Sequence, residues 1–550
     1  MKAIKPLPRR KLYEKVPLLD CFTAPCKGGC PIHQDIPEYI ELCRKGAYAS
    51  ALRLITEKNP LPFITGTICA HNCMTKCMRN YYDEPVNIRA TKLVAAEKGY
   101  DAYMSKITPP APVTDGRKVA VIGGGPTGMS AAYFVGRAGI PVTLFEKADR
   151  LGGIVRQVIP AFRISDEAID KDVALMEKMG VEVKLNTEAP SVAELKAQGY
   201  THIFFAVGAW KAGRLDIPGN VVPVIGWLRD MKAGKDVSLG HVAVVGGGNT
   251  AMDAARAALR AGAKSSTLVY RRTKKYMPAD AEELEMAIAD GVEFLELVAP
   301  VEQKDGKLIC EKMKLGDPDD KGRRKPVGTG EFETLAVDSV IGAIGQTVDW
   351  GTLDVGALTT TKKGTAEADA LTYQTAQPDI FVGGDCYTGP KFAIDAIAAG
   401  REGAISLHRY VHEGQSLTLA RDPREFYELD KKQAVVPIDC FDAPARQTVA
   451  HDASKAKTFS NDRITFTEAQ VKAEASRCLG CGVSVVDQNK CIGCGLCTTR
   501  CEFDAIHLQR DMPEASRMYR TEDKMKAILP HMVKRAAKLT IKDIKGKRAK

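Results

Sequence analysis

The 550-residue sequence predicts an α/β fold with two doubly wound parallel sheets, flanked by a helical N-terminal domain and a small α+β segment near the C-terminus. Three observations support this prediction. A strand, a glycine-rich turn, a helix and a second strand follow one another in residues 118–147, and the same order returns in residues 241–272. A proline-rich linker, ITPPAPVTDGRK, precedes the first unit. Cysteines gather at the two ends of the chain.

The N-terminal region has helical periodicity. The segment IPEYIELCRKGAYASALRLITEKN carries apolar residues at helical spacing, with a break at Gly46. It therefore predicts two consecutive helices.

The first glycine-rich turn has the spacing of a dinucleotide-binding loop. Its glycines, Gly123, Gly125 and Gly128, follow an apolar strand and open a helix. Gly123 allows a tight turn, Gly125 lets a pyrophosphate approach the backbone, and Gly128 lets the helix pack closely on the strand. Glu146 ends the next strand, where a carboxylate can accept hydrogen bonds from a ribose. A glycine turn without a ligand is the alternative, but the full pattern favours a Rossmann-like site.

The second turn differs at two places. Its small residues are Gly246, Gly248 and Ala251, and its second strand ends in Arg271 and Arg272 without an acid. A carboxylate there would repel a 2′-phosphate, whereas guanidinium groups bind phosphate through paired hydrogen bonds. The pattern predicts NADP(H) rather than NAD(H), unless the two arginines are only surface residues.

A later strand ends in Gly384 and Asp385 before another helix, an arrangement suited to closing over a flavin. One dinucleotide site whose second strand ends in an acid, Glu146, and one whose second strand ends in two arginines therefore indicate FAD plus NADPH. Residues 78–309 contain no cysteine, and Cys386 has no cysteine near it in sequence. The flavin thus lacks the redox-active cysteine pair of a disulfide reductase. Its electrons are expected to leave through the cysteine-rich ends.

The C-terminal cysteines have the spacing of a bacterial ferredoxin motif. A full copy consists of Cys491, Cys494, Cys497 and Cys501, and a shortened copy, Cys478 and Cys481, precedes it. In a two-copy ferredoxin the fourth cysteine of each motif binds the other cluster. We therefore expect one [4Fe–4S] cluster here, completed by Cys478 or Cys481, and a second only with a borrowed ligand.

Charge and hydropathy limit the other possibilities. The net charge is +10, and residues 511–550 carry 12 Lys/Arg and 5 Asp/Glu. A basic tail can bind nucleic acid or an acidic membrane, but a solvated docking extension is commoner, and we expect no nucleic-acid partner. The tail is expected to be helical and interrupted at Pro530. The sequence shows neither a run of ~18 apolar residues nor a signal peptide, which predicts a cytoplasmic protein without a transmembrane segment.

These motifs resemble one family, the NADPH-dependent small (β) subunit of glutamate synthase. The same motifs are similar to the N-terminal flavin region of dihydropyrimidine dehydrogenase and to the large subunit of bifurcating NADH-dependent ferredoxin:NADP oxidoreductases. The resemblance covers residues 15–412 and rests on CKGGCPIHQDIPEYI, NPLPFITGTICAHNCMTKC, GGGPTGMSAAY, LGGIVRQVIPAFRIS, VVGGGNTAMDAAR, VYRR with MPA, and GGD. The ferredoxin-like extension makes the chain most similar to subunits named for selenate reductase or formate-linked enzymes.

The resemblance implies that the NADP(H) domain is inserted in the FAD domain. The expected parts are a helical iron–sulfur domain (1–106), the FAD domain (117–208 and 335–412), the NADP(H) domain (209–334), a connector (413–475), a ferredoxin-like [4Fe–4S] segment (476–510) and a basic helical tail (511–550). The family motifs add further cofactor-binding residues: Pro126, Thr127, Lys147, Gly153 and Arg156 for FAD, and Asn249 and Thr250 for NADP(H).

The resemblance also implies two [4Fe–4S] clusters in the N-terminal domain. One would be shared by Cys21, Cys26 and Cys77, and the other by Cys30, Cys69 and Cys73. Both fourth ligands depart from the family pattern, because Leu18 and Lys92 stand at their positions. A substitute ligand from Asp20, His71 or Cys43, a three-iron form and a missing cluster all remain open, and zinc is the alternative metal.

We therefore expect an NADP(H)-dependent electron-transfer flavoprotein that is one subunit of a complex. It would move electrons between NADP(H), FAD and two to four [4Fe–4S] clusters, to or from a partner subunit or a ferredoxin. Transhydrogenase, formate- or hydrogen-linked and molybdenum-reductase complexes are the candidates, and no catalytic residue beyond the cofactors is expected. A glutamate synthase small subunit is the alternative enzyme. A zinc-bearing, nucleic-acid-binding protein is the alternative from another class.

Overall fold

Both expected parallel sheets are present in the computed structural model. The structure describes residues 16–19, 23–113, 116–235, 237, 240–319, 322, 324–353, 355–356, 358–412, 414–419, 421, 424–427, 444–482, 491–500, 506–509 and 519–548. The first sheet has the strand order β16-β5-β2-β3-β4, with every neighbouring pair parallel. Its strands are β2 (Val119–Ile122), β3 (Val142–Phe145), β4 (Glu182–Lys184), β5 (His202–Phe205) and β16 (Ile380–Val382). Strands β2, β3, β5 and β16 are buried throughout, as expected for a parallel sheet covered on both faces.

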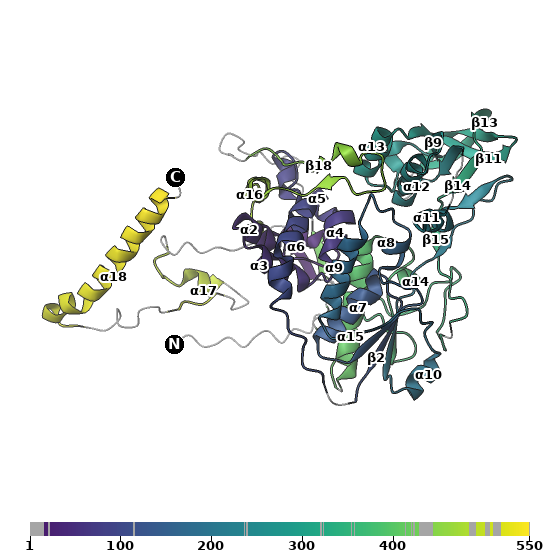
Figure 1. Cartoon of the computed structure of the whole chain (residues 1–550). Coiled ribbons are helices and arrows are strands. Elements are labelled where there is room, and N and C mark those ends of the chain that lie inside the picture. The colour runs from purple at the N-terminus through teal and green to yellow at the C-terminus, as the bar shows by residue number, and fades with distance from the viewer. Residues whose placement is uncertain are drawn as a thin grey trace. The chain divides into compact units, whose positions relative to one another are not determined.

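Two long helices pack together beside this sheet. Helix α7 (Pro126–Arg137) starts at the first glycine turn, with Pro126 in the first turn where its missing N–H costs nothing. Figure 1 shows α15 (Ala393–Val411) running alongside it. The contact requires Gly400, since a methyl group there would lie 2.3 Å from the Thr127 carbonyl oxygen. The other helices of this part are α8 (Gly153–Gln157), α9 (Asp166–Glu177), α10 (Val192–Ala197) and α14 (Asp385–Thr388).

The second sheet is formed by strands that come, in sequence, between β5 and β16 of the first sheet. Its order is β10-β9-β8-β14-β7, and all neighbours are parallel. Its strands are β7 (Val221–Pro223), β8 (His241–Val245), β9 (Ser265–Tyr270), β10 (Glu293–Glu296) and β14 (Ser339–Gly342), with helices α11 (Val224–Lys232), α12 (Asn249–Arg260) and α13 (Ala281–Asp290). Three antiparallel strands, β11 (Val298–Lys304), β12 (Lys307–Pro318) and β13 (Arg324–Ala336), extend from it.

One expected boundary is corrected by this topology. Residues 335–412 were assigned to the first sheet's domain, but β14 lies between β8 and β7 in the second sheet. The chain returns to the first domain through β15 (Gln346–Thr347), which pairs with the outgoing β6 (Lys211–Ala212).

The N-terminal domain is helical, as expected. Its elements are α1 (Pro25–Gly28), α2 (Ile36–Arg44), α3 (Tyr48–Thr56), α4 (Pro62–Ile68), α5 (Asn72–Thr75), η1 (Met78–Tyr81) and α6 (Ile88–Met104). Gly46, with a φ of +72°, separates α2 from α3, so the predicted break is confirmed. Asp172 of α9 joins this domain to the first sheet by accepting hydrogen bonds from the N–H groups of Phe63 (3.0 Å) and Ile64 (2.8 Å) in the first turn of α4.

The segment after residue 412 returns to the N-terminal domain. Strand β17 (Arg424–Tyr427) pairs in parallel with β1 (Val16–Leu19), and β18 (Ala450–His451) pairs with β19 (Arg463–Ile464). After a short helix, η4 (Ala453–Lys455), helix α16 (Glu468–Ser476) packs against α2 and α6. The chain divides into two compact units between Val483 and Ser484.

The second unit comprises residues 1–11 and 484–550. Its described elements are α17 (Leu496–Arg500) and α18 (Thr521–Arg548). The expected interruption at Pro530 is wrong, because α18 continues through it. A proline removes one backbone hydrogen bond, but its neighbours include Lys, Ala, Leu and Met, which favour helix. No helix in the described part of the chain combines the length and hydropathy needed to cross a bilayer.

Candidate cofactor sites

The first glycine turn lies at the carboxyl end of β2. Gly123 has a φ of +106°, and a methyl group on Gly128 would lie 1.8 Å from the Gly123 carbonyl oxygen, so the chain itself needs glycine at both positions. Gly125 is different. Its backbone is extended (φ −75°, ψ 179°), and a methyl group there would meet nothing closer than the Gly153 Cα at 3.9 Å. The free space beside Gly125 is therefore available to a ligand.

Glu146 lies directly against this turn. Its carboxylate accepts hydrogen bonds from the Gly124 N–H (2.7 Å) and the Ala148 N–H (2.8 Å), and the side chain is 8% exposed. A carboxylate can accept further hydrogen bonds, so these contacts leave it able to receive a ribose hydroxyl. Lys147 is exposed.

Gly384 and Asp385 reach the same edge of the sheet. Gly384 has a φ of +74°, and a methyl group there would lie 2.2 Å from the Thr127 hydroxyl oxygen at the start of α7. Asp385 accepts a hydrogen bond from the Lys391 N–H at 3.1 Å. Burial, with a smaller contribution from the nearby Asp395 carboxylate, raises the pKa of Asp385 to about 6. The strand end expected to close over a flavin is thus beside the first glycine turn.

The LGG segment also approaches the turn. Gly153 has a φ of +55°, and a methyl group there would lie 2.8 Å from the Gly125 Cα. Arg156 is 5% exposed and is held within the chain, since its guanidinium donates to the Leu151 carbonyl and to Asp170 at 2.6 Å. Its contact with a cofactor remains a prediction.

The second glycine turn has equivalent free space. Gly248 is extended (φ −99°, ψ 171°), and nothing lies within 4 Å of a methyl group placed there. The Asn249 side-chain oxygen accepts a hydrogen bond from the Asp280 N–H at 3.0 Å, which closes the loop that follows the MPA motif. Of the neighbouring residues, Thr250 is partly exposed and Ala251 is buried.

The two arginines after β9 differ in their freedom. Arg271 is exposed, whereas the Arg272 Nε donates to the Arg324 carbonyl at 3.2 Å, at the start of β13. Lys274 and Lys275 are also exposed. Several cations therefore lie at the carboxyl end of β9, and of the two arginines only Arg272 makes a side-chain hydrogen bond within the described chain.

The two parallel-sheet domains hold no cysteine pair in their described residues. Cys310 and Cys386 are both buried, in separate apolar cores. Burial raises the pKa of each thiol to about 12, which makes both poor nucleophiles.

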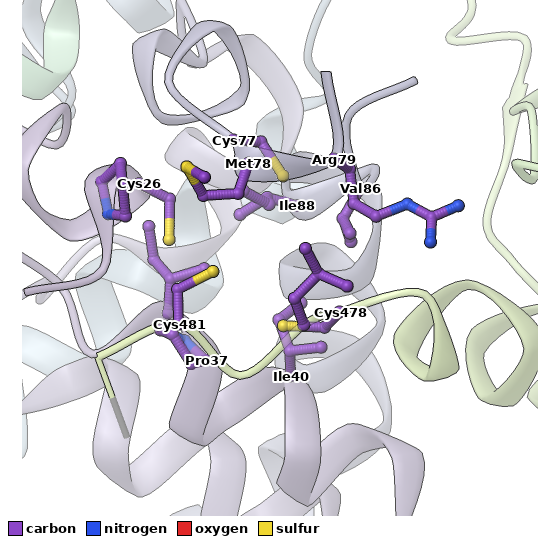
Figure 2. A pocket seen from close by; sticks show the side chains of 13 residues that line it. Cys26, Pro37, Ile40, Cys77, Met78, Arg79, Val86, Ile88, Cys478 and Cys481 are labelled. Carbon is purple, nitrogen blue, oxygen red and sulfur yellow. The ribbon is translucent and has the colours of Figure 1, made fainter. Parts of the chain in front are cut away.

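Four cysteines from distant parts of the chain line one pocket in the N-terminal domain. Figure 2 shows the sulfur atoms of Cys26, Cys77, Cys478 and Cys481 directed toward a shared space. The other lining residues are Pro25, Ile36, Pro37, Ile40, Met78, Arg79, Val86, Ile88 and Leu479. The structure therefore brings together Cys26 and Cys77, as the resemblance implied. It places Cys478 and Cys481 with them, whereas we expected these two to complete the C-terminal motif.

A second cysteine group lies nearby. Cys30, Cys69 and Cys73 are close enough for their charges to interact with one another and with Lys92, which is 4% exposed. The position of the missing fourth ligand is thus occupied by a buried ammonium group. Among the candidate substitutes, the His71 Nδ1 lies 3.2 Å from the Cys69 carbonyl oxygen and 3.3 Å from Asp280, while Cys43 is buried and lines no described pocket.

Three of the remaining predicted ligands belong to the C-terminal motif. Cys491, Cys494 and Cys497 are exposed in the second unit. Asp20, Cys21 and Cys501 lie outside the described residues.

Sequence reasoning missed the partnership of Cys478 and Cys481 with the N-terminal cysteines. One signal was available. The full C-terminal motif already contains four cysteines, and the N-terminal region lacks fourth ligands.

Comparison with known proteins agrees with this geometry. Residues 117–400 match the pyridine nucleotide-disulphide oxidoreductase family. Residues 14–102 match the dihydropyrimidine dehydrogenase domain II, 4Fe-4S cluster family, and residues 484–507 match the 4Fe-4S binding domain.

Three relatives show how far the similarity extends. The oxidoreductase YgfK of Escherichia coli (strain K12) is 41% identical over 485 residues, which cover 87% of this chain and 45% of that protein. The NADP(+)-dependent formate dehydrogenase subunit beta of Moorella thermoacetica is 35% identical, covering 84% of this chain and 70% of that subunit. The glutamate synthase [NADPH] small chain of Escherichia coli (strain K12) is 31% identical, covering 72% and 90%.

The chain thus spans less than half the length of the first of these relatives. It belongs to the pyridine nucleotide-disulphide oxidoreductase family, as an FAD- and NADP(H)-type member that carries 4Fe–4S domains.

Proposed function

We propose that the chain is the NADP(H)-oxidising or NADP⁺-reducing subunit of an electron-transfer complex. FAD would occupy the first sheet's edge, at Gly125, Glu146 and Asp385, and NADP(H) the second sheet's edge, at Gly248 and Arg271. Bound FAD exchanges a hydride with NADP(H) and releases electrons singly, and iron–sulfur clusters carry electrons one at a time.

One observation carries this proposal. In sequence, the whole second sheet is inserted between β5 and β16 of the first. In each sheet one strand, β2 or β8, is followed by a glycine turn with free space at its middle glycine. The chain's own residues would bind and orient the two dinucleotides. The extended backbone at Gly125 and Gly248, each at the start of a helix, lets phosphates approach N–H groups directly.

The absence of a cysteine pair from the described part of both sheets favours transfer to the iron–sulfur domains rather than to a disulfide. The partner is proposed to be another subunit of the complex or a ferredoxin, and the relatives named as β subunits and small chains support a subunit role. Cytoplasmic location is part of the proposal.

The test is anaerobic purification followed by flavin, iron and sulfide analysis. Added NADPH should bleach the flavin band and reduce a one-electron acceptor, whereas NADH should be much less effective. A colourless protein without flavin, or equal reaction with both nucleotides, would contradict the proposal.

A glutamate synthase small subunit is the second candidate, because similarity to that chain covers 90% of its length. The residues beyond 412, with their ferredoxin-like motif, disfavour it. Glutamine-dependent NADPH oxidation with an added large subunit would support this alternative.

A further inference from the structure

We propose that Cys26, Cys77, Cys478 and Cys481 together hold one [4Fe–4S] cluster. The pair Cys478 and Cys481 would supply the ligands that the N-terminal domain lacks, rather than ligands for the C-terminal motif. This inference rests on the proposed function in one respect, because that function supplies the iron–sulfur cluster as the group that is bound. Neither matched 4Fe-4S family includes this pair, because the matches cover residues 14–102 and 484–507.

The pocket has the chemistry of a cluster site. Its four sulfurs face a common space with a mainly apolar lining (Figure 2). Four cysteine thiolates are the usual ligands of a [4Fe–4S] cluster. A zinc ion would draw four sulfurs to about 3.8 Å from one another, given zinc–sulfur bonds of about 2.3 Å. Within the described residues, no three cysteine sulfurs all lie within 4.8 Å of one another. In any three of these sulfurs, at least one pair is therefore farther apart than a zinc site requires, which favours a larger group in which each sulfur binds a different iron.

A buried ion pair fixes the chain just before Cys478. Glu474 and Arg477 are paired at 2.8 Å, and both side chains are fully buried. Glu474 accepts hydrogen bonds from the N–H groups of Asn87 (2.7 Å) and Gln447 (2.6 Å), and Arg477 donates to the Glu84 carbonyl at 2.7 Å. The end of α16 is therefore attached to residues 84–87, which follow Cys77 closely.

A second contact fixes the chain just after Cys481. Gly482 has a φ of +72°, and a methyl group there would lie 2.5 Å from the Ala24 nitrogen. The chain thus presses against the residue two positions before Cys26. Both ends of the 478–481 segment are held by residues that lie within about ten positions of Cys26 or Cys77 in sequence, and such support holds ligands in place before a cluster binds.

The position of the family's leading cysteine offers no ligand. Leu18 lies in β1, paired with Phe426 of β17, and its side chain has no donor atom. Cys21 is the remaining competitor for this cluster, and the experiment must separate it from Cys478 and Cys481.

The experiment uses the full-length chain, purified anaerobically. In a background of Cys491→Ser and Cys494→Ser, which disables the C-terminal motif, we would add Cys478→Ser and Cys481→Ser together, or Cys21→Ser alone. Iron and acid-labile sulfide per chain and the EPR spectrum of the reduced protein are the readouts. Cys43→Ser is the matched control, since Cys43 is buried on α2 and does not line the pocket.

The inference predicts that the 478/481 pair removes about four further irons per chain and one EPR signal. Cys21→Ser and Cys43→Ser should remove none. No further iron loss from the 478/481 pair, or an equal loss from Cys21→Ser, would overturn the assignment. Flavin content shows whether each variant has folded.

Alkylation of the wild-type protein provides a test without substitutions. Cys26, Cys77, Cys478 and Cys481 should be protected from iodoacetamide together and become reactive together when a chelator removes iron. Reaction of Cys478 and Cys481 while Cys26 and Cys77 stay protected would refute the site, as would zinc in place of iron and sulfide. Wild-type protein without iron, sulfide and flavin would instead refute the proposed function.

Discussion

The two middle glycines allow the two dinucleotide sites to be tested separately. Gly125→Ala should weaken FAD binding and Gly248→Ala should weaken NADPH binding, while both variants fold. Neither added methyl group meets an atom closer than 3.9 Å, and both backbones have conformations that alanine adopts. Removing glycine's freedom in the unfolded chain gains about 0.4–1 kcal/mol, and losing a glycine N-cap costs a similar amount. The free energy of unfolding should therefore change by less than about 1 kcal/mol.

Ligand binding should respond much more strongly. Each methyl group would stand where a phosphate meets the backbone, and the loss of one charge-assisted hydrogen bond costs about 1.5–3 kcal/mol. This corresponds to a dissociation constant raised about 10- to 150-fold. Flavin fluorescence titration of apoprotein would measure the first constant, and NADPH titration of flavin-loaded protein the second.

The reciprocal pattern is the critical result. Gly125→Ala should leave the nucleotide site intact, and Gly248→Ala should leave flavin content unchanged. Gly128→Ala serves as the contrast, because its methyl group would collide with the Gly123 carbonyl at 1.8 Å and should destabilise the fold itself. If Gly125→Ala bound FAD normally, or if either variant lost both ligands, the assignment of the two sheet edges would be refuted.

Three other substitutions probe the site and its support. Arg271→Ala should raise KM for NADPH about 10- to 100-fold with kcat and NADH kinetics unchanged, because it removes a phosphate contact; an equal effect on NADH would argue against that role. Asp385→Asn should stabilise the apoprotein. The folded-state pKa of Asp385 is raised to about 6, so the folded protein binds this proton more tightly than the unfolded chain does. The protonated carboxyl therefore contributes fully to the free energy of unfolding below the unfolded-state pKa, and this contribution is lost as pH rises through 6. The stability of Asp385→Asn relative to wild type, measured by thermal melts, should therefore rise between pH 4 and 6 to about 2 kcal/mol, allowing for the partial exposure of the side chain. Above pH 6 this difference should stay constant. A gain independent of pH would contradict this origin. Glu474→Gln should cost about 3–5 kcal/mol, because it removes the fully buried counter-charge of Arg477 and leaves only the partly exposed Asp83 carboxylate, at 3.0 Å, to balance the guanidinium. Glu468→Gln, at an exposed pair with Lys98, should cost less than about 1 kcal/mol in the same denaturation assay. Similar losses from the two variants would refute the distinction.

Local patterns predicted the fold well because they depend on nearby residues. The turns at Gly123 and Gly246 and the helix break at Gly46 follow from backbone conformations that only a few neighbours determine. The placement of β14 was missed because a short apolar strand such as Ser339–Gly342 fits either parallel sheet. Only the tertiary structure decides which sheet accepts it.

The cysteine partnership was missed for a related reason. Cys478 and Cys481 are near Cys491 in sequence, and spacing alone assigned them to that motif. What separates them is the buried Glu474–Arg477 pair, whose partners lie almost 400 residues earlier, at Asn87 and Glu84. No periodicity or motif in either segment records such a contact.

The cysteines of the four-cysteine pocket are synthesised at two widely separated times. Cys26 and Cys77 leave the ribosome about 400 residues before Cys478, which at ~5–20 residues per second is an interval of roughly 20–80 s. Throughout that time the apolar face of α2, with Ile36 and Ile40, lacks the wall that α16 and its following cysteines provide. A ribosome that stalls before residue 478 therefore releases a product that cannot close this pocket, and an intact pocket marks a chain translated beyond residue 481.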